Sequence, residues 1–223
     1  MSDGITDEQI RYYRSRAAEY DATAYGSLTT AREHIARITS DLPRDISTLE
    51  LACGTGMWTE ALAQRTREIT AVDASPEAIV IAQRRCPAWV RFVYADIWQW
   101  VPDRRYQLIF FAFWLSHVPT SRLPKFFALL DRALTPSGDV IFVDEQESHA
   151  SPEKRTSDPE IVERTLEDGT VHHLVKVFVD PEKMVAGLEG LDWTCELNPD
   201  GSDWLVGRAQ RKGSAARPSG TPN

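Results

Sequence analysis

The stretch Leu49-Glu50-Leu51-Ala52-Cys53-Gly54-Thr55-Gly56 decides the fold. It predicts a largely apolar strand, a turn with two glycines one residue apart, and then a helix. A Gly-x-Gly turn lets the backbone approach a bound ligand closely, and the first turn of the next helix offers unpaired N–H groups to it. We therefore expect a nucleotide-like ligand against Gly54 and Gly56. A tight strand-to-helix turn without a ligand is the alternative.

A second signal is the β-branched run at 69–73, which ends in Asp73. A carboxylate at the tip of the second strand can accept hydrogen bonds from both hydroxyls of a ribose, so we expect an unphosphorylated ribose. Thr59 stands where a dinucleotide fingerprint has its third glycine. Glu50 puts a charge inside the first strand, which is costly unless it organises polar groups at the loop. Both residues argue against a nicotinamide dinucleotide.

The glycine stretch at 49–56 and the acidic strand end at Asp73 together resemble motif I and the following acidic strand end of the class I S-adenosylmethionine-dependent methyltransferases. The resemblance implies S-adenosyl-L-methionine as the cofactor. It also implies that Asp96 contacts the adenine amino group while Ile97 packs on the ring, although a helix cap is the alternative for Asp96. Four further residues near the strand ends are expected at the cofactor: Glu50, Ala52, Ala74 and Phe113.

Strands and helices alternate along the chain. Expected strands lie at 47–52, 69–73, 90–95, 107–112, 139–144, 193–197 and 204–209. Expected helices lie at 5–21, 29–38, from the glycine loop to about 67, from Ser75, at 121–134 and at 181–188. This pattern predicts an α/β fold with a doubly wound, mostly parallel, seven-stranded Rossmann-like sheet.

The domain organisation follows from this alternation. We expect one methyltransferase domain over residues 1–212, with a helical lid over 1–42. An insertion over 145–180 follows the fifth strand, contains a β-hairpin and is expected on the acceptor side. Residues 213–223 are poor in apolar groups and are expected to be a disordered tail.

Composition restricts the partners. The chain has 223 residues, 42% of them hydrophobic, and a net charge of −8 without a dense basic stripe. A small-molecule substrate is therefore favoured over nucleic acid. Three cysteines fit neither a disulfide framework nor a CxxC metal site. Without an apolar leader or a stretch long enough to span a membrane, the protein is expected in the cytoplasm, away from membranes.

A narrower resemblance rests on three segments, at 12–21, 111–119 and 163–178. They are similar to the small bacterial O-methyltransferases that include the dehydrophos phosphonate O-methyltransferase. This likeness implies that the N-terminal helix closes over the site and that Tyr13 and Arg16 help to hold the cofactor's carboxylate. The alternative is a helix that packs its aromatic face on the core. The likeness also implies that basic hairpin residues grip an anionic acceptor, and these are Arg164 and Lys176 here.

The histidines bear on the acceptor. His173 replaces an arginine of the relative's second hairpin strand, and a neutral hydroxyl benefits from such a base whereas an anionic oxygen does not. We therefore expect a hydroxyl acceptor, of sugar or natural-product type, rather than a carboxylate or phosphonate. Adjacent side chains on a strand point to opposite faces, so at most one of His172 and His173 faces the acceptor. His117, after the fourth strand, is either a second candidate base or a structural histidine.

The stretch from Asp144 to His149 is rich in oxygen ligands and could hold Mg²⁺, although an exposed acidic loop is the alternative. The sequence thus predicts an S-adenosylmethionine-dependent O-methyltransferase acting on a small molecule. N-methylation, a nicotinamide-dependent oxidoreductase and a non-catalytic cofactor-binding partner are the rival functions. A homodimer through the aromatic N-terminal segment and the hairpin is left open.

Overall fold

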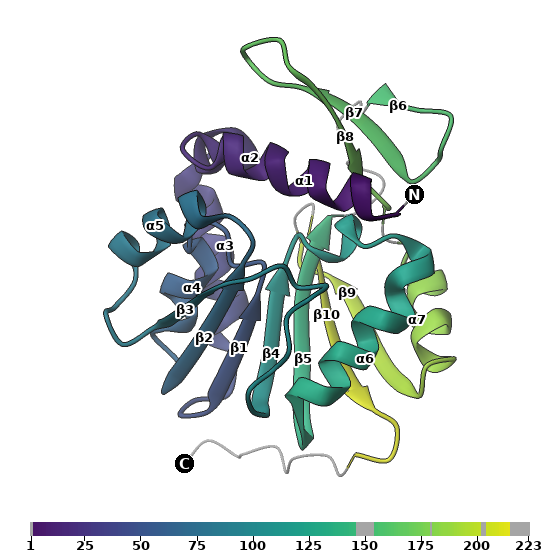
Figure 1. Ribbon diagram of the computed structural model, residues 1–223. Helices are drawn as coiled ribbons and strands as arrows, with labels where there is room; N and C mark the ends of the chain where they lie inside the picture. Colours follow the sequence, from purple (N-terminus) through teal and green to yellow (C-terminus); the bar gives the residue numbers. More distant parts are fainter. Residues whose placement is uncertain (1, 146–153, 179, 202–203, 215–223) are drawn as a thin grey trace.

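The computed structural model describes residues 2–145, 154–178, 180–201 and 204–214. Its centre is a seven-stranded sheet in the order β3-β2-β1-β4-β5-β10-β9 (Figure 1). The strands are β1 Ser47–Leu51, β2 Glu68–Asp73, β3 Arg91–Tyr94, β4 Tyr106–Ala112, β5 Leu134–Glu145, β9 Trp193–Pro199 and β10 Trp204–Arg211. Strands β1 to β5 pair in parallel, and β10 is antiparallel to both of its neighbours. The predicted mostly parallel, doubly wound sheet is confirmed.

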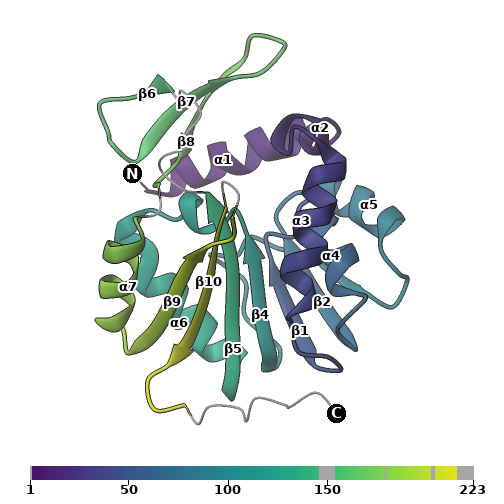
Figure 2. The ribbon, with the colours of Figure 1, turned by 180° about the vertical axis from the view of Figure 1, so that it is seen from behind.

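Helices cover both faces of this sheet (Figures 1 and 2). On one face lie α3 Leu28–Ser40, α4 Met57–Leu62 and α5 Pro76–Arg85, and on the other lie α6 Leu123–Ala133 and α7 Pro181–Glu189. Strand β4 serves both layers, because Leu108 and Phe110 join the α3 and α4 core while Ile109 and Phe111 join the α6 core. A strand buried on both faces reads as a continuous apolar run, which is why β4 is apolar nearly throughout.

Local signals set the helix ends near the site. The Ser75 hydroxyl accepts the Ala78 N–H at 3.0 Å, with Pro76 at the first helical position of α5. Helix α4 ends at Leu62, before the predicted end near 67. The difference arises because the Arg65 N–H already donates to the Leu62 carbonyl, a tighter turn that closes the helix and leads into β2.

The N-terminal segment forms two helices, α1 Ser2–Arg16 and α2 Tyr20–Ala24, where one helix over 5–21 was predicted. The first helix ends because the N–H groups of Ala17 and Glu19 bond to carbonyls three residues earlier instead of four. Helix α1 lies between the central sheet and a small sheet of three strands, β6 Lys154–Arg155, β7 Ile161–Thr165 and β8 Val171–Val175 (Figure 1). The predicted hairpin is therefore present as β7 and β8, and β6 extends it.

Side chains of α1 complete the edge of this small sheet. Strand β8 forms one edge of the small sheet, and its His173 and Val175 N–H groups donate to Glu8 Oε1 at 2.8 Å and Gln9 Oε1 at 3.2 Å. Backbone N–H donors that are shielded from water need acceptors, and the side chains of two neighbouring residues of α1 provide them. Toward the main sheet, Arg14 of α1 makes a bidentate bond to Glu77 of α5. Helix α1 thus connects the hairpin to the rest of the fold.

In the described parts of the chain, no helix combines the length and apolar character that crossing a bilayer requires. The predicted tail over 213–223 lies outside the described residues from 215 onward.

Gly207 of β10 packs directly against the ring of Phe142 on β5. A Cβ at this position would lie 2.1 Å from Cζ of Phe142 on β5. We expect Gly207→Ala to lower the free energy of unfolding by about 1 to 3 kcal/mol, because the ring has to shift within a filled core. Urea denaturation measures this change. Gly187→Ala in the exposed part of α7 meets nothing within 4 Å and should instead stabilise the chain by about 0.5 to 1 kcal/mol. Equal midpoints for the two variants would refute this account.

Candidate active site

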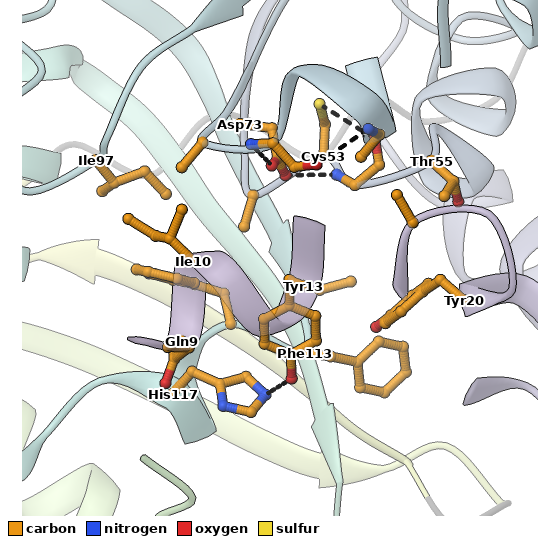
Figure 3. A pocket seen from close by; sticks show the side chains of 18 of the residues that line it. Gln9, Ile10, Tyr13, Tyr20, Cys53, Thr55, Asp73, Ile97, Phe113 and His117 are labelled. Atoms are coloured by element: carbon orange, nitrogen blue, oxygen red, sulfur yellow. Dashed lines mark hydrogen bonds between the residues drawn. The ribbon is translucent and has the colours of Figure 1, made fainter. Parts of the chain in front are cut away.

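A cavity of about 120 Å³ lies where the carboxyl ends of β1, β2 and β4 meet α1 (Figure 3). We call it the glycine-loop cavity, after residues 52–56. Most residues predicted at the cofactor line it: Tyr13, Ala52, Gly54, Asp73, Ala74, Asp96, Ile97 and Phe113. Gln9, Tyr20 and Trp98 line it as well and were missed, because no local pattern in the sequence places them there.

Asp73 organises the loop. Its Oδ2 accepts the Gly54 N–H at 2.7 Å and its Oδ1 accepts the Ser75 N–H at 2.8 Å, so one carboxylate joins the glycine loop, β2 and the start of α5. Burial raises the pKa of Asp73 and these N–H donors oppose that rise. Each oxygen keeps a further lone pair, and the residue lines the cavity, so it can accept from a ligand's hydroxyls.

The two glycines are needed for different reasons. Gly56 has φ +82°, and a Cβ there would lie 2.8 Å from Cβ of Ala82, so Gly56 permits the close approach of the loop to α5. Gly54 has φ +53°, and nothing lies within 4 Å of its Cβ position. Because Gly54 also lines the cavity, it leaves open backbone for a ligand to approach.

Two residues other than glycine also have a left-handed backbone conformation at the site. Ala52 after β1 and Phe113 after β4 both have φ +54°. Such a backbone is strained for a residue with a bulky side chain, and such strain concentrates at ligand sites. The Phe113 N–H donates to the Val143 carbonyl at 2.7 Å, which holds the ring at the cavity wall. The sequence alone gave no sign of this conformation.

Glu50 and Asp96 differ in position. Glu50 is buried beneath the loop and is not among the residues that line the cavity, and burial next to Asp73 raises its pKa to about 8. Within the described chain, its Oε2 has no hydrogen-bond partner. Asp96 lines the cavity and also accepts the Trp98 N–H at 2.9 Å. Its carboxylate therefore caps a turn and also lies at the ligand space, and the contact with adenine stays a prediction.

A second cavity of about 490 Å³ lies between α1, α2 and the hairpin. We call it the hairpin cavity. It shares five lining residues with the glycine-loop cavity: Tyr13, Tyr20, Tyr25, Phe113 and His117. The two spaces therefore meet at a wall of aromatic rings and one histidine, where a group bound in one would face a group bound in the other.

His117 is fixed within this wall. Its Nδ1 donates to the Val175 carbonyl at 2.7 Å, since a carbonyl can only accept, and its Nε2 accepts the Tyr13 hydroxyl at 2.7 Å (Figure 3). Burial, together with the charges of Lys176 and Arg164, holds the pKa of His117 well below its usual range. Burial raises the pKa of Tyr13 to about 12. The pair is neutral at physiological pH, with both imidazole nitrogens in use.

Two basic residues predicted at the acceptor, Arg164 and Lys176, line the hairpin cavity. The side chain of Lys176 is buried, and its Nζ donates to Glu145 Oε2 at 2.8 Å and to Ser116 Oγ at 3.2 Å. The guanidinium of Arg164 lies over the Tyr12 ring, with 5.9 Å between Cζ and the ring centroid. Arg164 on β7 and Lys176 just after β8 thus bring cations to the side of the wall opposite the glycine loop, where Glu145 at the end of β5 binds Lys176.

Arg16 lies on this same side. It lines the hairpin cavity and donates to the Tyr12 hydroxyl at 2.8 Å and to Thr23 Oγ1 at 2.5 Å. It is not among the residues that line the glycine-loop cavity, where its predicted role at the cofactor's carboxylate would need it. Tyr13, predicted for the same role, lies at the wall between the two cavities and bonds to His117.

The structure does not bring His173 to these residues. Among the described residues that line the two cavities, His173 is absent, and its half-exposed ring lies 3.7 Å from Glu8 and 3.9 Å from Glu163. The strand alternation explains this, because β8 directs His173 away from the face that carries Lys176 and the site.

The predicted Mg²⁺ site finds no support. In the described ranges, no group of three His, Cys, Asp or Glu side chains is arranged to hold a metal ion. Asp144 accepts the N–H groups of Ser116 and Glu145, while Glu145 binds Lys176. The remaining predicted ligands, at 146–149, lie outside the described residues.

The residues that line the glycine-loop cavity suit the polar and apolar groups of an adenosyl cofactor. Asp73 can accept from a ribose, Asp96 and the buried Ile97 provide an acceptor and an apolar surface for a base, and Gly54 leaves the backbone open between them. An α/β sheet with a site suited to a nucleoside beyond β1, β2 and β3, next to a second cavity for another molecule, is the arrangement that an S-adenosylmethionine-dependent transferase requires.

Comparisons with known proteins agree with this class. A family described as "Methyltransferase domain" matches residues 48–138. The solved DhpI-SAH complex is 34% identical, covers 96% of this chain and 100% of that chain, and superposes with a TM-score of 0.84. The DhpI-SAM-HEP complex is 35% identical over 94% of this chain and 99% of that chain, with a TM-score of 0.83. Malonyl-[acyl-carrier protein] O-methyltransferase from Paenibacillus sp. (strain JDR-2) is 32% identical over 64% of this chain and 55% of its own length.

The chain therefore belongs to the class I S-adenosylmethionine-dependent methyltransferases and is similar to DhpI along nearly its whole length. The family resemblance seen in the sequence is confirmed. The chain spans about half the length of the curated relatives it matches.

Asp73→Ala should weaken the binding of S-adenosylhomocysteine by about ten- to 100-fold, because hydrogen bonds to a charged acceptor contribute about 1.5 to 3 kcal/mol. Isothermal titration calorimetry measures the dissociation constant. Glu33→Ala, an acid removed from the exposed face of α3, is the control and should bind normally. A dissociation constant unchanged in Asp73→Ala would remove the ribose assignment.

Glu50 should make stability depend on pH. Its pKa is about 8 when folded and 4.5 in its ordinary state, so folding retains a proton that the unfolded chain releases. Its stabilising contribution is full below pH 4.5 and is lost as the pH rises toward 8, by at most about 1.4 kcal/mol per pH unit. Urea unfolding of wild type and Glu50→Gln from pH 5 to about 9 tests this. The variant should gain relative stability with pH, and a constant difference would disprove the assignment.

Proposed function

We propose that this chain transfers the methyl group of S-adenosylmethionine to a small-molecule oxygen that is already anionic when it binds in the hairpin cavity. The observation that carries the proposal is the position of Arg164 and Lys176, which line that cavity beyond the wall shared with the cofactor space. Cations are the groups that bind a carboxylate or phosphonate oxygen most strongly.

The positions and hydrogen bonds of the histidines favour an anionic acceptor over a neutral hydroxyl acceptor. A hydroxyl needs a base, and His117 is a poor one because its nitrogens are engaged and its pKa lies well below the usual range. Arg164 and Lys176 would also oppose an imidazolium at this position. The preference for a hydroxyl acceptor rested on His173, which does not line either cavity among the described residues. An ionised oxygen is nucleophilic without either histidine.

The chain's own contribution is then alignment and exclusion of water. When bound, S-adenosylmethionine supplies an electrophilic methyl group. Asp73 and Asp96 hold the nucleoside half, while Tyr13 and Phe113 form the wall next to the reacting groups. Helix α1 and the hairpin cover this space, and their mutual hydrogen bonds keep the cover in place. Holding two reactants close and in line is a large part of the rate enhancement of such transfers.

One observation favours a hydroxyl acceptor as the second candidate. Tyr13, His117 and the Val175 carbonyl form a continuous hydrogen-bonded chain at the wall between the two cavities. A hydroxyl could give its proton to Tyr13 Oη while the Tyr13 proton passes to His117 Nε2. In that mechanism Tyr13→Phe abolishes turnover. With an anionic acceptor the same variant retains turnover, reduced by the loss of alignment.

The test is transfer of labelled methyl from S-adenosylmethionine to a panel of carboxylic acids, phosphonates, sugars and amines. We expect a methyl ester of a carboxylic acid or of a phosphonate, identified by mass spectrometry and NMR of the product. A labelled ether or N-methylated amine would overturn the proposal.

Arg164→Ala should raise the acceptor KM at least about tenfold, since a charge-assisted hydrogen bond is lost, while the dissociation constant of S-adenosylhomocysteine stays the same. Arg164→Lys should restore part of the loss. Arg208→Ala removes the same charge from the exposed side of β10 and serves as the control. An unchanged acceptor KM in Arg164→Ala would exclude Arg164 from the acceptor site.

A further inference from the structure

The hairpin cavity contains a carboxylate in direct contact with one of its cations. Glu145, the last residue of β5, lines the cavity and binds Lys176 through a 2.8 Å contact between Oε2 and Nζ. The Lys176 side chain is 4% exposed and that of Glu145 is 45% exposed. The lysine is therefore a buried charge whose counterion stands at the ligand space.

This pairing leaves a defined place for a ligand. A lysine ammonium has three N–H donors, and here Glu145 and Ser116 accept from two of them. An acceptor molecule can take the third without displacing Glu145. Because a buried ammonium is costly without its counterion, Glu145 is expected to stay paired and so to remain next to the bound head group.

The charges around that head group almost cancel. Arg164 and Lys176 contribute two positive charges, and Glu145 removes one. Asp144 lies behind Lys176, where its oxygens accept the N–H groups of Ser116 and Glu145. Arg16 is directed to Tyr12 and Thr23, with Glu19 at 3.9 Å, and Glu167 adds a further acid at the exposed rim. Arg164, Lys176 and Glu145 together carry a net charge of +1, and the acids behind Lys176 and at the rim lower the positive charge further, so the site balances at most one negative charge.

We propose that Glu145 restricts the acceptor to monoanions, and that the acceptor is a carboxylic acid rather than a dianionic phosphonate or phosphate. This inference rests on the proposed function, an anionic acceptor in the hairpin cavity. A second negative charge on the head group would face the Glu145 carboxylate across the Lys176 ammonium. The volume of about 490 Å³ leaves room for an acceptor whose body is larger than its carboxylate, and the rings of the wall offer flat faces to that body.

The transfer then balances without a proton step. A carboxylate oxygen forms the new C–O bond to the methyl carbon as the C–S bond of the sulfonium breaks and its electron pair stays on sulfur. The products are a methyl ester and S-adenosylhomocysteine. One negative and one positive charge disappear together, which agrees with a site that provides no effective base.

The experiment is a titration of the protein loaded with S-adenosylhomocysteine, using benzoate and phenylphosphonate as probes. These molecules share a body, and at mildly alkaline pH the first is a monoanion and the second a dianion. Wild type should bind benzoate more tightly. In Glu145→Gln the ratio of the phenylphosphonate to the benzoate dissociation constant should fall by about tenfold, because a dianion loses twice the repulsion of a monoanion.

Two controls separate the possible outcomes. Glu33→Gln removes an equal charge from the exposed face of α3, away from the cavity, and should leave the ratio unchanged. In wild type, acidification that converts phenylphosphonate to a monoanion should strengthen its binding relative to benzoate, which tests the inference even if Glu145→Gln fails to fold. A ratio unaffected by both Glu145→Gln and acidification would overturn the inference while anion binding stands. If neither probe binds wild type, or Arg164→Ala weakens neither, the proposed function itself is wrong.

Discussion

The carboxylate of Asp73 is the point on which the site depends. It accepts one N–H from the glycine loop after β1 and one from the residue that begins α5, so it joins both to the end of β2. Gly56 lets the loop approach α5, and Gly54 leaves the inner side of the loop open. The strained backbone at Ala52 borders the same space. The nucleoside site is therefore built from backbone geometry that a single side chain holds together.

The cover over the site has a different origin. Helix α1 is mostly polar, and its position follows from specific bonds rather than from a large apolar face: Glu8 and Gln9 bind the edge of β8, and Arg14 binds Glu77. Tyr13 then reaches His117 at the wall between the cavities. Because the same helix bonds to the hairpin and lines both cavities, the geometry of the donor and acceptor sides is coupled through it.

The sequence predicted what depends on local pattern and missed what depends on tertiary position. Apolar runs and turn residues predict the strands and the capped start of α5, and the spacing from the glycines to Asp73 predicts the nucleoside site. The direction of His173 depends on how β8 sits against α1, and the contact of Lys176 with Glu145 joins segments far apart in the chain. The left-handed Phe113 depends on the bond to Val143. No local rule encodes these long-range choices.

The bonds from α1 to β8 also bear on the behaviour of the chain when its first helix is absent. Glu8 and Gln9 occupy two N–H groups at the open side of the small sheet. A shortened chain that begins beyond Arg16 would present this side as a bare strand edge, which is a template for pairing with another molecule. Proteolysis near the amino terminus would thus promote self-association of the cleaved protein, in addition to opening the site.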